Sequence, residues 1–309
     1  MNATIQYVSR GEATPLMYAA HNNSAGVAKL LIEASADVNT NVPPLGFSAL
    51  IEAAENNSAD VAKLLIEAGA DVNARDYAYI TALMYAANNN STGVAKLLIQ
   101  AGADVNEKDS KDITALMCAA EKTAKYIASL LIEAGADMDA SDAYDKTALM
   151  YAAENNAKDI ARLLIEAGVD VNAENIYGRT ALMYAADNDF TDMAELLIEA
   201  GANVDAQDED GRTALMYAVA EKNLSDSYDA GVARLLIQAG ADVNARNDYG
   251  GTALMYAARR NGSYEAKLLI EAGADVNAKN QFGETALMLA AELDTAEVTN
   301  LLKAAGAKE

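Results

Sequence analysis

The sequence Thr-Ala-Leu-Met-Tyr-Ala-Ala recurs, with small variations, nine times along the 309 residues of the chain. The copies begin at residues 14, 48, 81, 114, 147, 180, 213, 252 and 285, so six of the eight intervals are 33 residues and the others are 34 and 39. A fixed period of this length is typical of stacked structural units that each pack against their neighbours. Because such a stack grows by adding units, we expect a single domain over residues 1–309 rather than the two domains that the length alone favours.

One unit, residues 81–114, predicts the local structure of the others. Thr81 is a suitable N-cap because its hydroxyl can accept a hydrogen bond from the first helical turn, and apolar residues follow at the i, i+3, i+4 spacing of a short helix. Asn90 ends this helix, and Gly102 ends a second helix that includes residues 94–99, since both residue types tolerate a left-handed helix end. The residues from 104 to 112 then form an extended finger with a turn at its tip.

This helix–turn–helix–finger unit, entered by Thr-x-Leu-x-x-Ala, resembles the ankyrin repeat. The Gly-Ala-Asp-Val-Asn segment after the second helix, as at residues 69–73 and 273–277, is also similar to that family. The resemblance covers about residues 10–309 and implies an all-α repeat solenoid, an ankyrin-repeat stack of helix-turn-helix units with extended β-hairpin-like fingers. We place the repeats at approximately residues 11–43, 44–77, 78–110, 111–143, 144–176, 177–209, 210–248, 249–281 and 282–309.

The chain departs from the family's pattern in four ways. Only Pro15 keeps the family's proline, and the family's His is Met in eight copies and Ile51 in the ninth, so we expect the adaptable Met side chain to fill that space. The interval of 39 residues places six extra residues within 220–230, between two helices. We expect strained or differently shaped tips in three fingers, where another residue replaces the turn glycine of five others: Tyr79, Asp112 and Asp145.

Acidity limits the kind of partner. The chain has 23 Lys and Arg against 46 Asp and Glu, a formal net charge of −23. Because nucleic acids and anionic membranes attract basic surfaces, we expect neither as a partner, and expect another protein instead. The lone Cys118 forms no internal disulfide, and no signal peptide or membrane-spanning apolar run is visible, which favours a cytoplasmic location.

Candidate catalytic residues are few. His21 is the only histidine and lies at an expected helix end, while Cys118 has no histidine in its own part of the stack. The sequence contains no nucleotide-binding glycine motif and no zinc-ligand spacing. We therefore do not expect an enzyme, and we expect no catalytic residue, cofactor or metal site.

A tyrosine recurs two residues after the leucine of the first helix in most repeats, and Glu52, Cys118 and Leu289 interrupt the series. This spacing places the ring about 200° from the leucine, toward the inner face of the stack. Two interpretations stay open: the rings pack against their neighbours, or they form a recognition stripe, because Tyr is enriched at binding hot spots. The series, here named the tyrosine ladder, is Tyr18, Tyr85, Tyr151, Tyr184, Tyr217 and Tyr256, and Tyr85, Tyr151 and Tyr184 are candidate binding residues.

Aromatic residues also lie at the expected finger tips, where turns ordinarily favour Gly, Asn, Asp and Ser. In ankyrin proteins the tips and the concave face of the first helix usually contact the partner, so the resemblance implies the same role for the corresponding residues here. From the fingers these are Tyr77, Tyr79, Ile80, Ile113, Tyr144, Tyr177, Arg179, Arg212, Tyr249 and Phe282, and from the helix ends Glu121, Lys122, Arg259 and Arg260.

The sequence thus favours a non-catalytic, monomeric scaffold that binds a partner protein on its concave face and finger tips. A self-associating structural array is an alternative, and so is the targeting segment of a larger enzyme or effector. The first repeat motivates both, because Val27, Leu30, Leu31 and Ile32 keep the apolar pattern of internal repeats. We expect either that the natural protein extends before Met1 or that residues 1–12 fold over this end.

Overall fold

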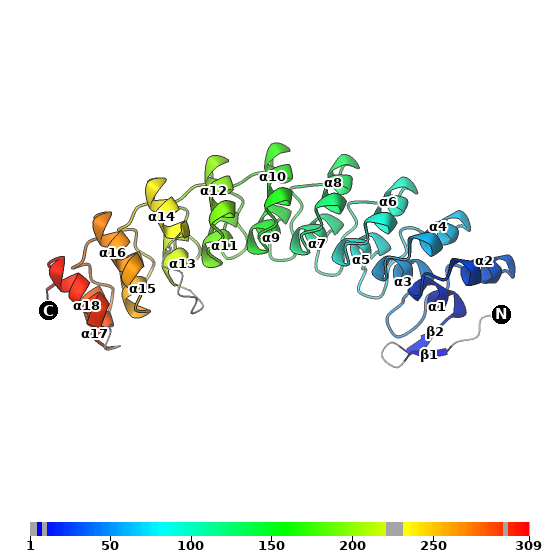
Figure 1. The fold of residues 1–309 in the computed structure, drawn as a ribbon, viewed down its shortest axis with the longest axis horizontal. Coiled ribbons are helices and arrows are strands. Elements are labelled where there is room, and N and C mark those ends of the chain that lie inside the picture. The colour runs from blue at the N-terminus through cyan, green and yellow to red at the C-terminus, as the bar shows by residue number, and fades with distance from the viewer. Residues whose placement is uncertain (1–4, 8–10, 221–230, 293–295, 309) are drawn as a thin grey trace. The chain divides into compact units, whose positions relative to one another are not determined.

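The computed structural model describes residues 5–7, 11–220, 231–292 and 296–308 (Figure 1). Packing divides the chain into two compact units, Met1–Val169 and Asp170–Glu309. The single domain expected over residues 1–309 stays a prediction.

The first unit contains a short antiparallel hairpin and five helix pairs. Strands β1 (Ile5–Tyr7) and β2 (Gly11–Ala13) pair with Ile5 opposite Ala13. The helices are α1 (Pro15–His21), α2 (Ala25–Glu33), α3 (Ala49–Glu55), α4 (Ala59–Glu67), α5 (Ala82–Asn88), α6 (Thr92–Gln100), α7 (Ala115–Glu121), α8 (Lys125–Glu133), α9 (Ala148–Glu154) and α10 (Lys158–Glu166).

The second unit repeats the same pairing in four further repeats. Its helices are α11 (Ala181–Asp187), α12 (Thr191–Glu199), α13 (Ala214–Ala220), α14 (Gly231–Gln238), α15 (Ala253–Arg259), α16 (Ser263–Glu271), α17 (Ala286–Glu292) and α18 (Ala296–Ala304). Most of the insertion expected within residues 220–230 lies outside the described residues.

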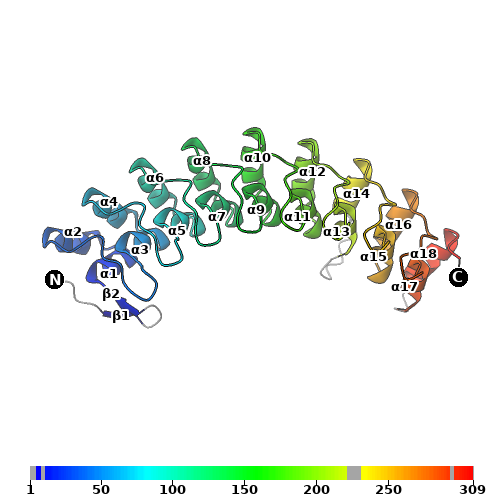
Figure 2. The same cartoon turned by 180° about the vertical axis from the view of Figure 1, so that it is seen from behind.

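Within each unit the helices form two rows, as Figures 1 and 2 show. The odd-numbered helices pack against one another, from α1 to α9 in the first unit and from α11 to α17 in the second. Each even-numbered helix packs on the odd-numbered helix of its own repeat. This arrangement confirms the predicted all-α repeat solenoid of helix-turn-helix units.

The core lies between the two rows and is built from Leu, Ala and Met. In α5, Leu83 and Met84 are 1% exposed and Ala86 is fully buried, so one helix of seven residues places a leucine, a methionine and small side chains in the core. Alanine allows the neighbouring helices to approach closely, and each buried leucine contributes about 1.5–3 kcal/mol. The expected filling by methionine is confirmed in seven of the eight copies, where Met is at most 4% exposed, whereas Met288 in the last repeat is 42% exposed.

The helix ends follow the predicted chemistry. Thr81 is the N-cap of α5, and its hydroxyl accepts a hydrogen bond of 3.3 Å from the Met84 N–H. Asn90 follows the end of α5 with a φ of 53°, and Gly102 follows α6 with a φ of 85°. Both residues therefore adopt the left-handed conformation that terminates a helix.

The finger turns also need a residue in the left-handed conformation. Glycine adopts this conformation most easily, but three fingers have another residue there. Tyr79, Asp112 and Asp145 have φ values of 64°, 61° and 56°, close to the 69° of Gly178 at the same position of another finger. The strain expected at these three tips is therefore confirmed. Four fingers are closed by an isolated antiparallel bridge, which confirms their hairpin-like form: Val42 with Phe47, Arg75 with Thr81, Ser141 with Thr147 and Gln207 with Thr213.

An asparagine after most of the second helices joins one repeat to the next, and Asp205 takes this position after α12. In the first unit, Asn106 accepts a hydrogen bond of 2.7 Å from the Asp137 N–H and donates one of 3.3 Å to the Gly135 carbonyl. In the second unit, Asn244 makes the same two contacts with Asp275 and Gly273. The asparagine of the Gly-Ala-Asp-Val-Asn segment thus provides hydrogen-bond partners for backbone groups at the end of the neighbouring second helix.

The first repeat exposes part of its apolar pattern. Val27 of α2 is 51% exposed and Leu30 is 67% exposed, whereas Val61, the counterpart of Val27 in α4, is fully buried. One of the two alternatives expected for this end was that residues 1–12 fold over it. The described part of that segment pairs as β1 and β2 and leaves this face of α2 uncovered.

Candidate interaction surface

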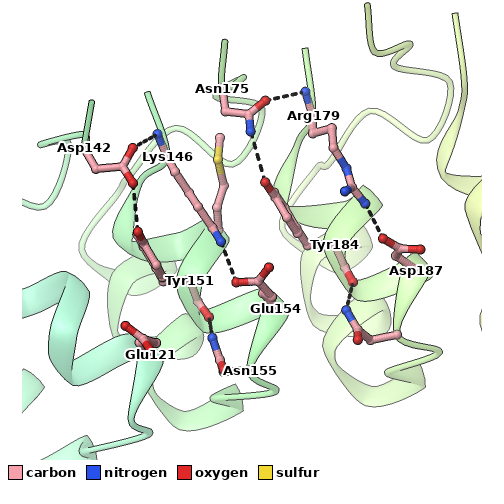
Figure 3. Close-up of polar contacts among 12 residues, drawn as sticks. Glu121, Asp142, Lys146, Tyr151, Glu154, Asn155, Asn175, Arg179, Tyr184 and Asp187 are labelled. Atoms are coloured by element: carbon pink, nitrogen blue, oxygen red, sulfur yellow. Dashed lines mark hydrogen bonds and ion pairs between the residues drawn. The ribbon is translucent and has the colours of Figure 1, made fainter. Parts of the chain in front are cut away.

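A side-chain carboxylate or carboxamide organises each regular finger turn. In the finger between the fourth and fifth repeats, Asp142 Oδ1 accepts hydrogen bonds from the backbone N–H groups of Tyr144 and Lys146, at 2.8 and 2.9 Å. Figure 3 shows the bond to Lys146. Asp and Asn favour such turns because their short side chains reach the backbone two and four residues ahead. The same pair of bonds is made by Asp76, Asp109, Asn175, Asp208, Asn247 and Asn280.

The tyrosine ladder ties the first helix to this turn. Tyr151 donates its hydroxyl to Asp142 Oδ2 at 2.8 Å, and Tyr85 makes the equivalent bond at 2.9 Å. Where the turn residue is asparagine the direction reverses, since the Asn175 amide donates to the Tyr184 hydroxyl at 3.0 Å. These ladder hydroxyls therefore have partners in the finger turn that immediately precedes their helix.

Burial and the turn carboxylates raise the pKa of two ladder tyrosines, Tyr151 and Tyr217. Desolvation, followed by the hydrogen bond to Asp142, raises the pKa of Tyr151, and desolvation with Asp208 does the same to the pKa of Tyr217. Cys118 takes the ladder position in the fourth repeat, where burial raises the pKa of its thiol to about 12. The thiol is therefore protonated and poorly nucleophilic near neutral pH.

Cationic side chains lie over the ladder rings. In the first unit, the Lys146 ammonium is 4.2 Å from the centre of the Tyr151 ring and pairs with the Glu154 carboxylate. Such an ammonium over an aromatic face gains about 0.5–2 kcal/mol. Figure 3 shows this lysine between its turn aspartate and Glu154.

In the second unit, an arginine is inserted between successive ladder rings. The Arg179 guanidinium lies 4.5 Å from the Tyr184 ring centre and 4.4 Å from that of Tyr217, and it pairs with Asp187. Arg212 lies 6.0 Å from Tyr217 and 5.8 Å from Tyr256. Both candidate binding arginines thus contribute to packing between repeats.

The aromatic side chains at the finger tips have a different environment. Their rings are at least half exposed, and the hydrogen bonds described for the tips use backbone groups rather than the phenol hydroxyls. Their exposed fractions are Tyr77 63%, Tyr79 55%, Tyr144 52%, Tyr177 50%, Tyr249 50% and Phe282 71%. These six residues are named the finger-tip aromatics.

Backbone hydrogen bonds hold neighbouring tips together within each unit. In the second unit, the Glu209 N–H donates to the Tyr177 carbonyl at 3.0 Å, and the Gln281 N–H donates to the Tyr249 carbonyl at 2.9 Å. Gly178 makes this approach possible, because a Cβ there would lie 2.9 Å from the Glu209 nitrogen. In the first unit, the Tyr77 N–H donates to the Leu45 carbonyl at 2.9 Å. The finger-tip aromatics are therefore presented from an ordered backbone.

The other candidate residues are dispersed. Glu121 and Lys122, at the end of α7, pair with each other at 2.6 Å. Arg259 is exposed at the end of α15, and Arg260 lies 3.5 Å from the buried carboxylate of Glu265. The side chains that follow the finger turns at Ile80 and Ile113 are half-buried.

Three features of this surface were not identified from the sequence. The turn-forming Asp and Asn residues always precede the ladder position by nine residues, which was a usable signal. Tyr126 of α8 is 72% exposed, yet it lies in the second helix row and no periodicity marks it. The exposed acids of the second unit's tips, Glu209, Asp210 and Asp248, were counted only as part of the overall charge.

Among the described residues, no group of three or more His, Cys, Asp or Glu side chains is arranged to hold a metal ion. The same part of the chain has no helix of sufficient length and apolar character to cross a bilayer.

Comparison with known proteins places the repeats in a family. A family model described as ankyrin repeats (3 copies) matches residues 2–76, 83–175, 168–247 and 224–308. No curated protein matches the chain. Ankyrin repeats are generally protein–protein interaction modules and are typically non-catalytic. Together with the stacked helix pairs, the Thr N-caps and the linked fingers, the matches over nearly the whole sequence show that this chain belongs to the ankyrin repeat family.

Proposed function

We propose that the chain is a non-catalytic scaffold that binds a partner protein through its finger tips. The observation that carries the proposal is that two sets of aromatic residues have different environments. Ladder hydroxyls such as that of Tyr151 bond to the finger turns, whereas finger-tip aromatics such as Tyr144 and Phe282 are 52% and 71% exposed. Large exposed aromatic side chains supply contact area with few rotatable bonds, which suits a binding surface.

Tyr79 gives the proposal a second support. It adopts a left-handed conformation with a φ of 64° at a position where other fingers have glycine, and its side chain is 55% exposed. This conformation costs a residue with a Cβ about 1–2 kcal/mol, and an exposed ring recovers little of that by burial. Strain retained at a surface position is consistent with a binding role.

The mechanism we propose is presentation of a preformed surface. The turn carboxylate of Asp142 and the hydroxyl of Tyr151 fix the finger, so little conformational entropy is lost when a partner binds. Tyr85, Tyr151 and Tyr184 then act as supports for the tips and not as direct contacts. Arg179 and Arg212 act in the same way, through the ring faces they cover.

The experiment compares four forms of the full chain as baits in a lysate of the source cells. They are the unaltered protein, Tyr79→Gly, Tyr177→Ala/Tyr249→Ala, and Tyr126→Ala as a control, whose tyrosine is 72% exposed on the second helix row. We expect a protein that the unaltered chain and the control retain and that a finger-tip variant loses. Tyr79→Gly is the sharpest form, because relief of strain makes it about 0.5–1 kcal/mol more stable while it loses a contact.

Thermal unfolding of each bait provides the folding control. Equal retention of every bound protein by all four forms contradicts binding through the tips. If a bound protein is lost only with Tyr126→Ala, the binding surface lies on the second row of helices.

A second candidate function is self-association through the first repeat. It is favoured by Val27 and Leu30, which are 51% and 67% exposed on α2. The net charge of −23 opposes it, since two copies repel each other at low salt. Sedimentation equilibrium over a range of concentrations and salt tests it: we expect a monomer throughout, and a mass that doubles with concentration and is restored to the monomer by Leu30→Ser establishes self-association.

A further inference from the structure

We propose that the finger tips of the second unit recognise a basic, extended segment of the partner protein, one in which Arg residues are frequent. The inference rests on the proposed function and specifies the partner's chemistry. It concerns the tips of four consecutive fingers, two residues in each: 176–177, 209–210, 248–249 and 281–282.

Three of these tips carry an aromatic side chain, and two of the four carry acidic side chains. Tyr177, Tyr249 and Phe282 are 50%, 50% and 71% exposed, and Asp210 occupies the corresponding position in the finger between the two tyrosines. The preceding positions add Glu209 and Asp248, both exposed. The eight tip positions thus hold three carboxylates and no basic residue.

The backbone places these side chains next to one another. The Glu209 N–H bonds to the Tyr177 carbonyl at 3.0 Å, and the Asp248 N–H bonds to the Asp210 carbonyl at 3.0 Å. Each bond joins one tip to the tip before it, so Glu209 directly follows the aromatic tip and Asp248 directly follows the acidic one. A partner segment that crosses the fingers therefore meets both aromatic rings and carboxylates.

The basic side chains of these fingers neutralise the tips only in part, because Arg212 pairs with one of the three tip carboxylates. Arg179 is held by Asp187 and lies between two ladder rings. Arg212 approaches the Asp210 carboxylate only to 4.0 Å and lies near two further rings. Arg246 donates to the Lys279 carbonyl at 2.9 Å, before the turn residues of both fingers.

The same unit shows which side chain suits such a surface. Arg179 is bound by two tyrosine faces and one carboxylate, in the layer below the tips. A guanidinium stacks on aromatic rings and forms two parallel hydrogen bonds with a carboxylate, and the compact ammonium of lysine does neither as well. An arginine from the partner would find the same combination at the tips, in Tyr177 with Glu209 and in Tyr249 with Asp248.

The first unit lacks this pattern and serves as a comparison. Its tips carry Tyr77 and Tyr144, but also Lys111, and its exposed turn acids, Asp112 and Asp145, occupy the left-handed position after the two tip residues. We therefore assign the recognition of a basic segment to the second unit alone.

The test measures fluorescence anisotropy of labelled peptides with the full chain. The probes are a short peptide in which Arg alternates with Ser, the same peptide with Lys for Arg, and the same peptide with Glu for Arg. We expect the Arg peptide to bind most tightly, the Lys peptide about threefold more weakly, and the Glu peptide not at all. Equal binding of the Arg and Glu peptides overturns the proposal.

Two variants with the same change in charge separate the tips from general acidity. The tip variant is Glu209→Gln/Asp210→Asn/Asp248→Asn, and the control is Glu195→Gln/Glu199→Gln/Glu297→Gln on α12 and α18. We expect about tenfold weaker binding of the Arg peptide to the tip variant and less than about twofold to the control. Equal weakening by both variants shows non-specific attraction and overturns the proposal.

Failure of this inference is distinguishable from failure of the proposed function. A lysate protein lost by Tyr177→Ala/Tyr249→Ala but not by the tip charge variant leaves the scaffold function standing and contradicts the basic partner. If no lysate protein depends on any finger tip, the proposed function fails as well.

Discussion

The link between Tyr151 and Asp142 makes a quantitative prediction about stability. Tyr151→Phe removes the 2.8 Å hydrogen bond from the hydroxyl to Asp142 Oδ2 and leaves the ring in place. A hydrogen bond to a charged group contributes about 1.5–3 kcal/mol, and because Tyr151 is half-buried, water partly replaces the lost donor. We expect the free energy of unfolding to fall by about 1–2 kcal/mol.

Tyr144→Phe is the matched control, since it also removes a phenol oxygen, from the tip of the finger that Tyr151 contacts. The Tyr144 side chain is 52% exposed and only its backbone N–H bonds to Asp142. We expect a change below about 0.5 kcal/mol. Asp142→Asn gives a second control: its Oδ1 keeps the turn bonds, and its amide can donate to the phenol oxygen as Asn175 does to Tyr184, so we expect a loss below about 1 kcal/mol.

The assay is urea unfolding followed by circular dichroism, fitted with a nearest-neighbour repeat model as well as a two-state model, because long arrays lose cooperativity. Equal midpoints for Tyr151→Phe and Tyr144→Phe contradict the assigned role of the ladder hydroxyl. A larger loss with Asp142→Asn than with Tyr151→Phe contradicts the interchange of Asp and Asn at the turn.

Three further predictions use other parts of the stack. Because burial raises the pKa of the Cys118 thiol to about 12, we expect a thiol reagent at about pH 8 to label the native chain at least tenfold more slowly than the urea-unfolded chain, and equal rates contradict its burial. Because the pKa values of Tyr151 and Tyr217 are raised in the folded chain, the unfolded chain loses these protons first, and stability falls as the pH rises above the ordinary tyrosine value of about 10. We expect the urea midpoint to fall less steeply with pH in a Tyr151→Phe/Tyr217→Phe variant than in the unaltered chain. Parallel curves for the two proteins contradict the assignment. Val61→Ala should cost about 1–3 kcal/mol and Val27→Ala less than about 0.5 kcal/mol, since the first valine is fully buried and the second is 51% exposed; equal losses in urea unfolding indicate that α2 is covered in solution.

Most of the fold follows from the sequence period. Thr81, Asn90 and Gly102 mark where helices begin and end, and their caps and left-handed conformations agree with that prediction. These signals are local, since each depends on a few adjacent residues. The strained turns at Tyr79 and Asp112 were predictable for the same reason, because the repeat register shows which residue replaces a glycine.

The role of the ladder tyrosines was not decided by the sequence. Spacing places Tyr151 on the face opposite Leu149, but it does not show that Asp142, nine residues earlier, lies beside its hydroxyl. That contact depends on how the finger folds back over the helix that follows it in the chain. The register of a single repeat contains this pairing, and the invariable spacing between turn residue and ladder position would have indicated it.

The arginine stack was harder to foresee. Arg179 lies between Tyr184 of its own repeat and Tyr217 of the next, so its position depends on packing between repeats. Sequence alone placed this arginine at a finger and favoured an exposed binding role. Its half-buried position, against two rings and Asp187, follows from the distance between successive first helices.

The most direct test of the account is hydrogen–deuterium exchange of the chain with and without the protein that it captures, read by mass spectrometry. We expect slower exchange on binding in peptides that contain the finger tips, above all those around Tyr177 and Tyr249, with little change in peptides from α12 and α16. Protection confined to the helices of the second row, with the finger peptides unchanged, would contradict binding through the tips.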